Sequence, residues 1–250
     1  MLRRVLKIGA ALALLALFLP AADSPATNLP QQESLTYDVE WRLINAGKAH
    51  LTWTQRPGDI KGYEIKLHLE SLGLVSRLFR VSDDYTATLH PDLCAVSTFM
   101  TAHEGSRNRE SRVSYGYRKA SYLERDLNKN SLVLSKDVET PVCVHDLIGG
   151  LYALRAQDLQ PGHSIQVPVS NGKRTASLKV EATRRETVRA GGTDYKTIAY
   201  EINAFNNVMY ARPGHMSLWL TDDKRKLPVQ LQIRLQFAVG TITFRLDRAE

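Results

Sequence analysis

Strict alternation of apolar and polar side chains is the feature of this sequence that most restricts its fold. Residues 229–237 read Val-Gln-Leu-Gln-Ile-Arg-Leu-Gln-Phe, with an apolar residue at every second position. Because successive side chains of a strand point to opposite faces, this pattern predicts a β-strand with one buried and one solvated face. Residues 35–43 alternate in the same way, and the pattern resumes at 49–53 after a turn at 45–48. The two segments therefore predict an antiparallel hairpin.

Similar segments recur along the whole chain and predict about a dozen strands. They lie at 63–69, 85–89, 96–100, 113–117, 165–169, 176–180, 198–205, 217–220 and 242–246. Asn171-Gly172 is suited to a tight hairpin turn, and the polar residues 222–226 are typical of a hairpin tip. Long half-solvated strands that follow one another favour a large curved sheet over a doubly wound α/β fold. We therefore predict an all-β, mainly antiparallel fold: a curved sheet or open half barrel with one or two short helices.

Two segments have helical spacing instead. Residues 74–79 and 146–157 carry apolar side chains three to five positions apart. In the second segment Asp146 lies near the N-terminus and Arg155 near the C-terminus, where their charges suit the helix dipole. Gly149-Gly150 weakens this helix and indicates a close packing partner, such as a sheet surface. Pro161-Gly162 should turn the chain after it.

Residues 1–22 have the three parts of a secretory signal peptide. Three basic residues come first, an apolar stretch follows at 8–19, and two alanines end the segment. The stretch of 12 residues is shorter than the roughly 20 of a membrane-spanning helix, so we expect cleavage after Ala22 and no transmembrane span in the mature chain. An uncleaved N-terminal anchor is the alternative. We expect an exported, periplasmic protein with a flexible lead-in at 23–32 and a single β-rich domain at 33–250.

The charge of the mature chain is mild. Without the three basic residues of the leader, 30 Lys and Arg stand against 26 Asp and Glu, a formal net charge of +4. The basic residues are scattered among expected strands and hairpin tips, which favours a solvated surface over a binding stripe. Export and the lack of a recognition-helix or zinc-finger pattern exclude nucleic acid as the expected partner.

The two cysteines, Cys94 and Cys143, both lie in the mature chain. Since export places them in an oxidising compartment, we predict that they form one structural disulfide. The alternative is a reactive thiol, which the absence of a Cys-x-x-Cys motif disfavours.

The sequence contains few candidates for chemistry. The histidines lack the spacing of a metal site, and no phosphate loop or nucleophile elbow is present. His145 beside Asp146 is the best-placed acid-base pair, although a helix-start role is the simpler interpretation. The paired carboxylates Asp83-Asp84 and Asp222-Asp223 could share a proton or hold a cation, but they are more simply explained as turn formers. We therefore predict no catalytic residue, metal or cofactor.

Aromatic residues on the apolar strand phases are the candidates for a ligand site. Tyr37, Trp41, Trp53 and Trp219 occupy such positions. They would be core residues in a filled sheet. In a concave, incompletely filled sheet, the same rings would line an apolar cavity.

Three motifs carry a resemblance that covers about residues 33–246. They are Glu33-Ser-Leu-Thr-Tyr-Asp-Val-Glu-Trp41 with Ala46-Gly47, Asp146-Leu-x-x-x-Leu-Tyr-x-Leu-Arg155 with Leu159-x-Pro161-Gly162, and Leu218-Trp-Leu-Thr-Asp222-Asp223 with Pro228-Val229. In these motifs the chain resembles the bacterial exported family known as domain-of-unknown-function family 3108. The resemblance implies a β-rich protein of the Gram-negative envelope, with no established activity and no catalytic residues to transfer.

Three hypotheses for function follow. The first is a non-catalytic periplasmic carrier that uses the curved sheet, covered by the helices at 74–79 and 147–154, to bind an apolar or lipid-like ligand. It predicts an apolar cavity. The second is an envelope assembly or structural factor that binds another protein through a free strand edge or exposed patch. The third is an envelope-directed hydrolase in which His145, Asp146, Asp222 and Asp223 converge. On architecture alone the expected fold is also similar to the half-barrel carriers of lipoproteins and lipids.

Overall fold

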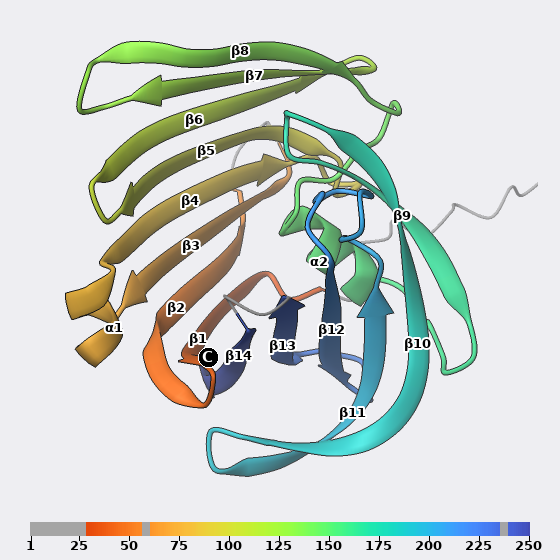
Figure 1. Ribbon diagram of the computed structural model, residues 1–250. Coiled ribbons are helices and arrows are strands. Elements are labelled where there is room, and N and C mark those ends of the chain that lie inside the picture. Colours follow the sequence, from red (N-terminus) through yellow and green to blue (C-terminus); the bar gives the residue numbers. More distant parts are fainter. Residues whose placement is uncertain (1–28, 57–60, 236–239) are drawn as a thin grey trace, which may run out of the picture.

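One antiparallel sheet contains all the strands of the computed structural model, which describes residues 29–56, 61–235 and 240–250 (Figure 1). The strands are β1 (Gln32–Trp41), β2 (Ile44–Gln55), β3 (Tyr63–Ser71), β4 (Val81–Leu89), β5 (Ala95–Glu104), β6 (Arg107–Gly116), β7 (Lys119–Asp126), β8 (Ser131–Glu139), β9 (Ser164–Ser170), β10 (Thr175–Ala190), β11 (Thr193–Ile202), β12 (Gly214–Thr221), β13 (Pro228–Leu235) and β14 (Thr241–Ala249). The predicted signal peptide at 1–22 lies outside the described residues.

The strand order places the first and last strands side by side in the middle of the sheet. The order is β8-β7-β6-β5-β4-β3-β2-β1-β14-β13-β12-β11-β10-β9, so the first strand pairs with the last and all other neighbours are consecutive. The sheet curls into an open, barrel-like shape with β8 and β9 at its two edges (Figure 1). The predicted all-β fold, an open curved sheet with two short helices, is confirmed.

The alternation seen in the sequence matches the burial of the strands. In β1 the apolar residues Leu35, Tyr37 and Val39 are buried and the residues between them are half-buried. They face the concave side of the sheet, where they join one apolar cluster with Trp53 and with Tyr152 of the second helix. Burial of this face supplies the main driving force for the curl.

The two helices have different positions. α2 (Gly149–Arg155) lies inside the curled sheet (Figure 1) and buries Tyr152 and Leu154. α1 (Gly73–Leu78) lies at the end of the β3–β4 hairpin and buries none of its residues. The hypothesis that residues 74–79 cover the sheet is therefore wrong, because this helix projects beyond the strand ends. Within the described residues, neither helix has the length and apolar character needed to cross a membrane.

A short segment bridges the two arms of the sheet. Cys143 forms the predicted disulfide with Cys94, with their Cα atoms 5.1 Å apart. The carbonyl of Val144 accepts a hydrogen bond from the amide of Ala95 at the start of β5 (2.8 Å). The backbone of His145 then pairs with the edge strand β9 in a parallel bridge. The 143–145 segment thus links β5 to β9 across the opening of the sheet.

Candidate functional site: an apolar cavity under the second helix

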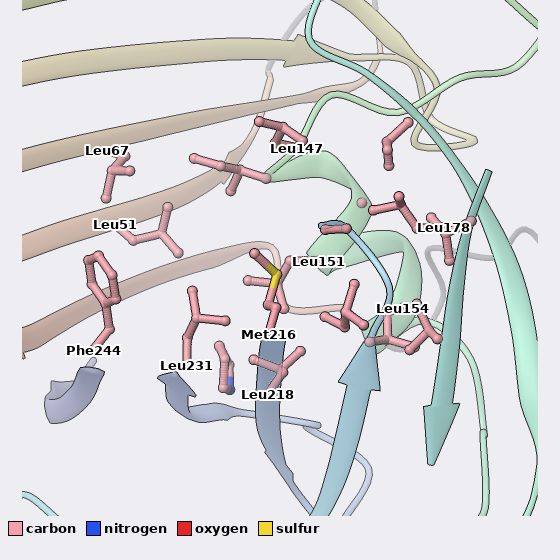
Figure 2. A pocket seen from close by; sticks show the side chains of 18 of the residues that line it. Leu51, Leu67, Leu147, Leu151, Leu154, Leu178, Met216, Leu218, Leu231 and Phe244 are labelled. Atoms are coloured by element: carbon pink, nitrogen blue, oxygen red, sulfur yellow. The ribbon is translucent and has the colours of Figure 1, made fainter. Parts of the chain in front are cut away.

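A cavity of about 280 Å³ lies between α2 and the concave face of the sheet (Figure 2). Its wall comes from both arms and from the helix, as Figure 2 shows for Leu51, Leu67, Leu147, Leu151, Leu154, Leu178, Met216, Leu218, Leu231 and Phe244. Leu147 is 40% exposed and belongs to this wall, so the cavity reaches the molecular surface beside the start of the helix.

The wall carries almost no polar group. Its side chains are aliphatic or aromatic apart from Gln230. The hydroxyl of Tyr37 donates a hydrogen bond to the carbonyl of Pro228 (2.9 Å) and is therefore already satisfied. Burial also raises the pKa of Tyr37 well above its usual value, so the group stays neutral. Because desolvating a polar group without a new partner is unfavourable, this cavity is suited to hydrocarbon.

Asp146 fixes the start of α2. Its Oδ1 atom accepts hydrogen bonds from the backbone amides of Ile148 and Gly149, both at 3.0 Å, and from the hydroxyl of Tyr85 at 2.7 Å. The other carboxylate oxygen lies against Gly149, where any Cβ atom would overlap it. Gly150 packs against Val169 of β9, so the expected close contact between this glycine pair and a sheet is present. The helix begins later than the predicted residue 146 because 147–148 form the capped turn.

A buried ion pair fixes the other end of α2. The guanidinium of Arg155 donates to both carboxylate oxygens of Glu33 on β1, at 2.6 and 2.8 Å. Neither side chain is more than 9% exposed. Burial alone would lower the pKa of Arg155, but the hydrogen bonds and negative charge of Glu33 outweigh it and raise this pKa. The helix is thereby tied to the first strand at its C-terminal end.

The aromatic residues expected to line a cavity are distributed over three places. Tyr37 is part of the wall. Trp53 is fully buried in the core next to it, stacked between Tyr63 and Tyr152 at centroid distances of 4.3 and 4.1 Å. The other two lie away from the cavity wall.

Trp219 and Trp41 are placed by their strand positions. Trp219 is out of phase with the wall residue Leu218, so it faces the opposite side of the sheet, and its Nε1 donates to Glu186 at 2.6 Å. Trp41 lies at the end of β1, where its ring packs beside the guanidinium of Arg42. These two tryptophans therefore do not line the cavity as expected. Trp219 points to the other face of the sheet, and Trp41 lies at the end of its strand.

The polar residues of the hydrolase hypothesis do not converge. His145 has Nδ1 2.8 Å from the carbonyl of Leu93, which can only accept, so this nitrogen carries the hydrogen. Asp146 caps the start of α2, whereas Asp222 and Asp223 lie in the β12–β13 turn near its far end. Asp222 pairs with Arg185, and Asp223 accepts from the turn residues that follow it. The seven-residue helix separates the two groups by roughly 10 Å.

The remaining motif residues have local structural roles. Gly47 lies so close to β3 that any Cβ atom would overlap the carbonyl of Glu70. Pro161 and Gly162 form the turn before β9, and Gly162 has a φ of 87° that favours glycine. The amide of Gly162 donates to the carbonyl of Ala182 on β10 at 2.8 Å.

Most of the cavity-wall residues that the sequence did not distinguish from core residues are leucines. Leu51, Leu67, Leu218 and Leu231 line the cavity from strands that the alternation did predict. Their positions in the pattern are those of ordinary core residues. The only additional signal is the glycine pair in α2, which brings the helix against β9.

Most of the chain matches the model of one protein family. The family model "Protein of unknown function (DUF3108)" matches residues 36–247. The chain belongs to this family. The DUF3108 match includes β2 to β13 in full, residues 36–41 of β1 and residues 241–247 of β14. Among proteins of curated function, none matches the chain.

Solved structures with a similar fold are distant in sequence. A β-barrel-like protein of the DUF1849 family from Brucella abortus has a TM-score of 0.55 at 8% identity, over 88% of this chain and 97% of that one. The DUF3108 chain and this protein therefore share a barrel-like fold.

Two other structures give lower scores. A DUF1089 family protein from Pseudomonas aeruginosa has a TM-score of 0.37 at 12% identity, over 71% of this chain and 86% of that one. A Bacteroides fragilis protein named as an exported protein with a YmcC-like fold has a TM-score of 0.38 at 8% identity, over 87% of this chain and 95% of that one. These scores are too low to define a shared fold.

Proposed function

We propose that this DUF3108 protein is a non-catalytic carrier in the periplasm that binds the hydrocarbon part of a lipid-like ligand under α2. The observation that supports it is the cavity itself, whose wall is apolar apart from Gln230 and the hydroxyl groups of Tyr37 and Tyr210, of which that of Tyr37 is hydrogen-bonded. The disulfide between Cys94 and Cys143 is consistent with an oxidising compartment.

The size of the cavity limits the ligand. Its volume of about 280 Å³ is near the lower end of the roughly 300–1,000 Å³ of small-molecule sites. An apolar cavity of about 150 Å³ is already sufficient for benzene. The ligand should therefore insert a single chain or ring system, and its polar group should remain near the opening beside Leu147.

Ligand extraction is the first test. The protein is purified from the periplasm of a Gram-negative host without detergent, and an organic extract is analysed by mass spectrometry. We expect one lipid class in stoichiometric amount that is absent from a mock purification. Repeated absence of any such molecule would count against the carrier and in favour of a filled or solvent-accessible core with no ligand.

A pair of matched variants links the ligand to the cavity. Leu231→Trp enlarges a wall side chain, whereas Leu132→Trp makes the same change on the edge strand β8, where Leu132 is 56% exposed. Binding of the fluorescent probe N-phenyl-1-naphthylamine should fall in the first variant only. Thermal unfolding of both variants should match the wild type, because each tryptophan enters free space. Equal probe binding by both variants would place the probe elsewhere.

A second candidate function rests on the free edge of the sheet. Among the strands of the described residues, β8 pairs only with β7, and both Leu132 and Val133 on it are exposed. An unpaired strand edge is a template for strand addition by another chain. A backbone-blocking proline at Val133 should abolish capture of an envelope protein partner if this candidate is correct.

A further inference from the structure

Exposed apolar side chains gather at one end of the strands. Leu43 and Ile44 lie at the β1–β2 turn, and Leu74, Leu78 and Phe79 lie on or directly after α1. We call these five residues the tip surface. Leu43 is 93% exposed and Leu78 is 73% exposed. Apolar surface gathered in this way is typical of an interaction site.

The two parts of the tip surface are neighbours. The amide of Leu72, just before α1, donates to the carbonyl of Ala46, just after the β1–β2 turn, at 2.8 Å. On its other side α1 approaches the β5–β6 turn, because the ring of Phe79 lies against Gly105. Within the described part of the chain, no residue of α1 is buried.

The two segments that carry the tip surface contain basic residues but no acidic ones. Residues 41–46 and 72–81 contain Arg42, Arg77 and Arg80 and no Asp or Glu. Arg77 and Arg80 are exposed, and neither forms an ion pair within the described ranges 29–56, 61–235 and 240–250. Apolar side chains that project beside Arg77 and Arg80 complement an anionic bilayer, whose phosphate groups bind the arginines and whose acyl boundary accepts the leucines.

The cavity lies toward the same end of the sheet. Phe244 of its wall is near the start of β14, where Thr241 accepts a hydrogen bond from the amide of Arg42 at 3.0 Å. Met216 is likewise near the start of β12. At the opposite end Trp53 and Tyr152 stack tightly and fill the space. The wall residues Phe244 and Met216 thus lie in the half of the sheet nearer the tip surface.

We propose that the tip surface docks the protein on an anionic phospholipid bilayer. Leu43, Leu78 and Phe79 insert at the acyl boundary, and Arg77 and Arg80 bind the phosphate groups. The proposal goes beyond the carrier function and does not require it, because docking uses side chains outside the cavity.

Vesicle flotation tests the proposal on protein made from the whole chain in a Gram-negative host. The vesicles are phosphatidylcholine alone or an equal mixture of phosphatidylcholine and phosphatidylglycerol. The tip variant is Leu43→Asn with Leu78→Gln, where asparagine suits the φ of 70° at position 43. The control is Tyr117→Asn with Val142→Gln, which removes 81% and 65% exposed side chains at the opposite strand ends. All variants share residues 1–28, so any contribution of that segment cancels.

We expect the wild type and the control to float with the mixed vesicles. The tip variant should partition at least about tenfold more weakly, since two leucines lose their burial. Arg77→Gln with Arg80→Gln should weaken binding to the mixed vesicles about fivefold per arginine and leave binding to phosphatidylcholine unchanged. The cavity variant Leu231→Trp should float like the wild type, which separates docking from ligand binding.

Two results would overturn the proposal. A wild type that stays in the dense fraction with the mixed vesicles has no bilayer affinity, and the tip surface would then belong to a protein partner. Equal flotation of the tip variant and the control would place membrane contact elsewhere on the protein. Circular dichroism of each variant confirms that these exposed substitutions leave the fold intact.

Discussion

The ion pair between Glu33 and Arg155 offers the sharpest test of how the cavity wall is held. We expect Glu33→Ala to lower the free energy of unfolding by about 3–5 kcal/mol, the range for a buried charge that loses its partner. The full range applies because the Arg155 side chain is 0% exposed and water cannot replace the lost carboxylate. Among the residues that the structure describes, its other hydrogen bond is the longer one to the carbonyl of Arg225, at 3.2 Å.

The double variant separates the charge from the packing. Among the described residues Arg155 Nε has no partner, so the pair is incompletely satisfied. Buried pairs are often replaced by apolar residues of similar size with little loss. Glu33→Leu with Arg155→Met should therefore be more stable than Glu33→Ala, and the two sites should show a coupling energy of about 1–3 kcal/mol.

Urea unfolding followed by tryptophan fluorescence measures these changes. Trp53 stacks on Tyr152 of α2 and so reports on the docking of this helix. A loss below about 1 kcal/mol for Glu33→Ala would mean that solvent reaches Arg155 and that the ion pair is not a fixed tie. A double variant that loses the sum of two single losses would refute the coupling.

Three further predictions concern closure, packing and pH. Replacing Cys94 and Cys143 by alanine should lower the free energy of unfolding by about 4 kcal/mol for the sequence separation of 49; urea unfolding with and without a reductant checks this, and equal midpoints would contradict it. Gly47→Ala should lower the melting temperature by an amount equivalent to about 1–3 kcal/mol, because its Cβ would overlap a backbone carbonyl. Burial raises the pKa of Asp83, so the folded state binds its proton more tightly than the unfolded state does and Asp83 destabilises the fold above that pKa. Asp83→Asn should thus be more stable than the wild type at pH 8, and the difference in unfolding free energy should narrow as the pH falls through the raised pKa. Urea titrations at several pH values measure this difference, and a difference independent of pH would contradict the prediction.

The sequence predicted strands wherever one face meets an apolar layer. β1 and β13 were clear because their inward residues pack against the core. β7 and β8 were missed, since they extend beyond the region that α2 covers. On β7 the inward face carries Glu124 beside Tyr122, and the two side chains are hydrogen-bonded to each other. A small apolar cluster that includes Ala120 and Tyr122 covers only part of these strands, so other inward positions are polar and the alternation is lost.

The candidate site was harder to predict than the fold. The pattern placed Tyr37 and the leucines of α2 on an apolar face, but the same pattern describes a filled core. Whether a cavity forms depends on how far α2 stands from the sheet. That spacing is set in part by Glu33 and Arg155, which are 122 positions apart in the sequence. No local sequence pattern predicts a contact between residues so far apart in the chain.

Polar anchors at both ends of α2 explain how an apolar cavity can persist in this protein. An apolar helix held only by packing would shift until its leucines met the sheet, because contact is favourable and non-directional. Here Asp146 fixes the first turn through hydrogen bonds to two backbone amides, and Arg155 fixes the last through a bidentate pair with β1. Hydrogen bonds are directional, so moving the helix toward the sheet would break these bonds. Their donors and acceptors would then be buried without partners, which is unfavourable. The two anchors therefore hold the helix at a distance from the leucines of the sheet. The space between helix and sheet is the cavity that we propose for an apolar ligand.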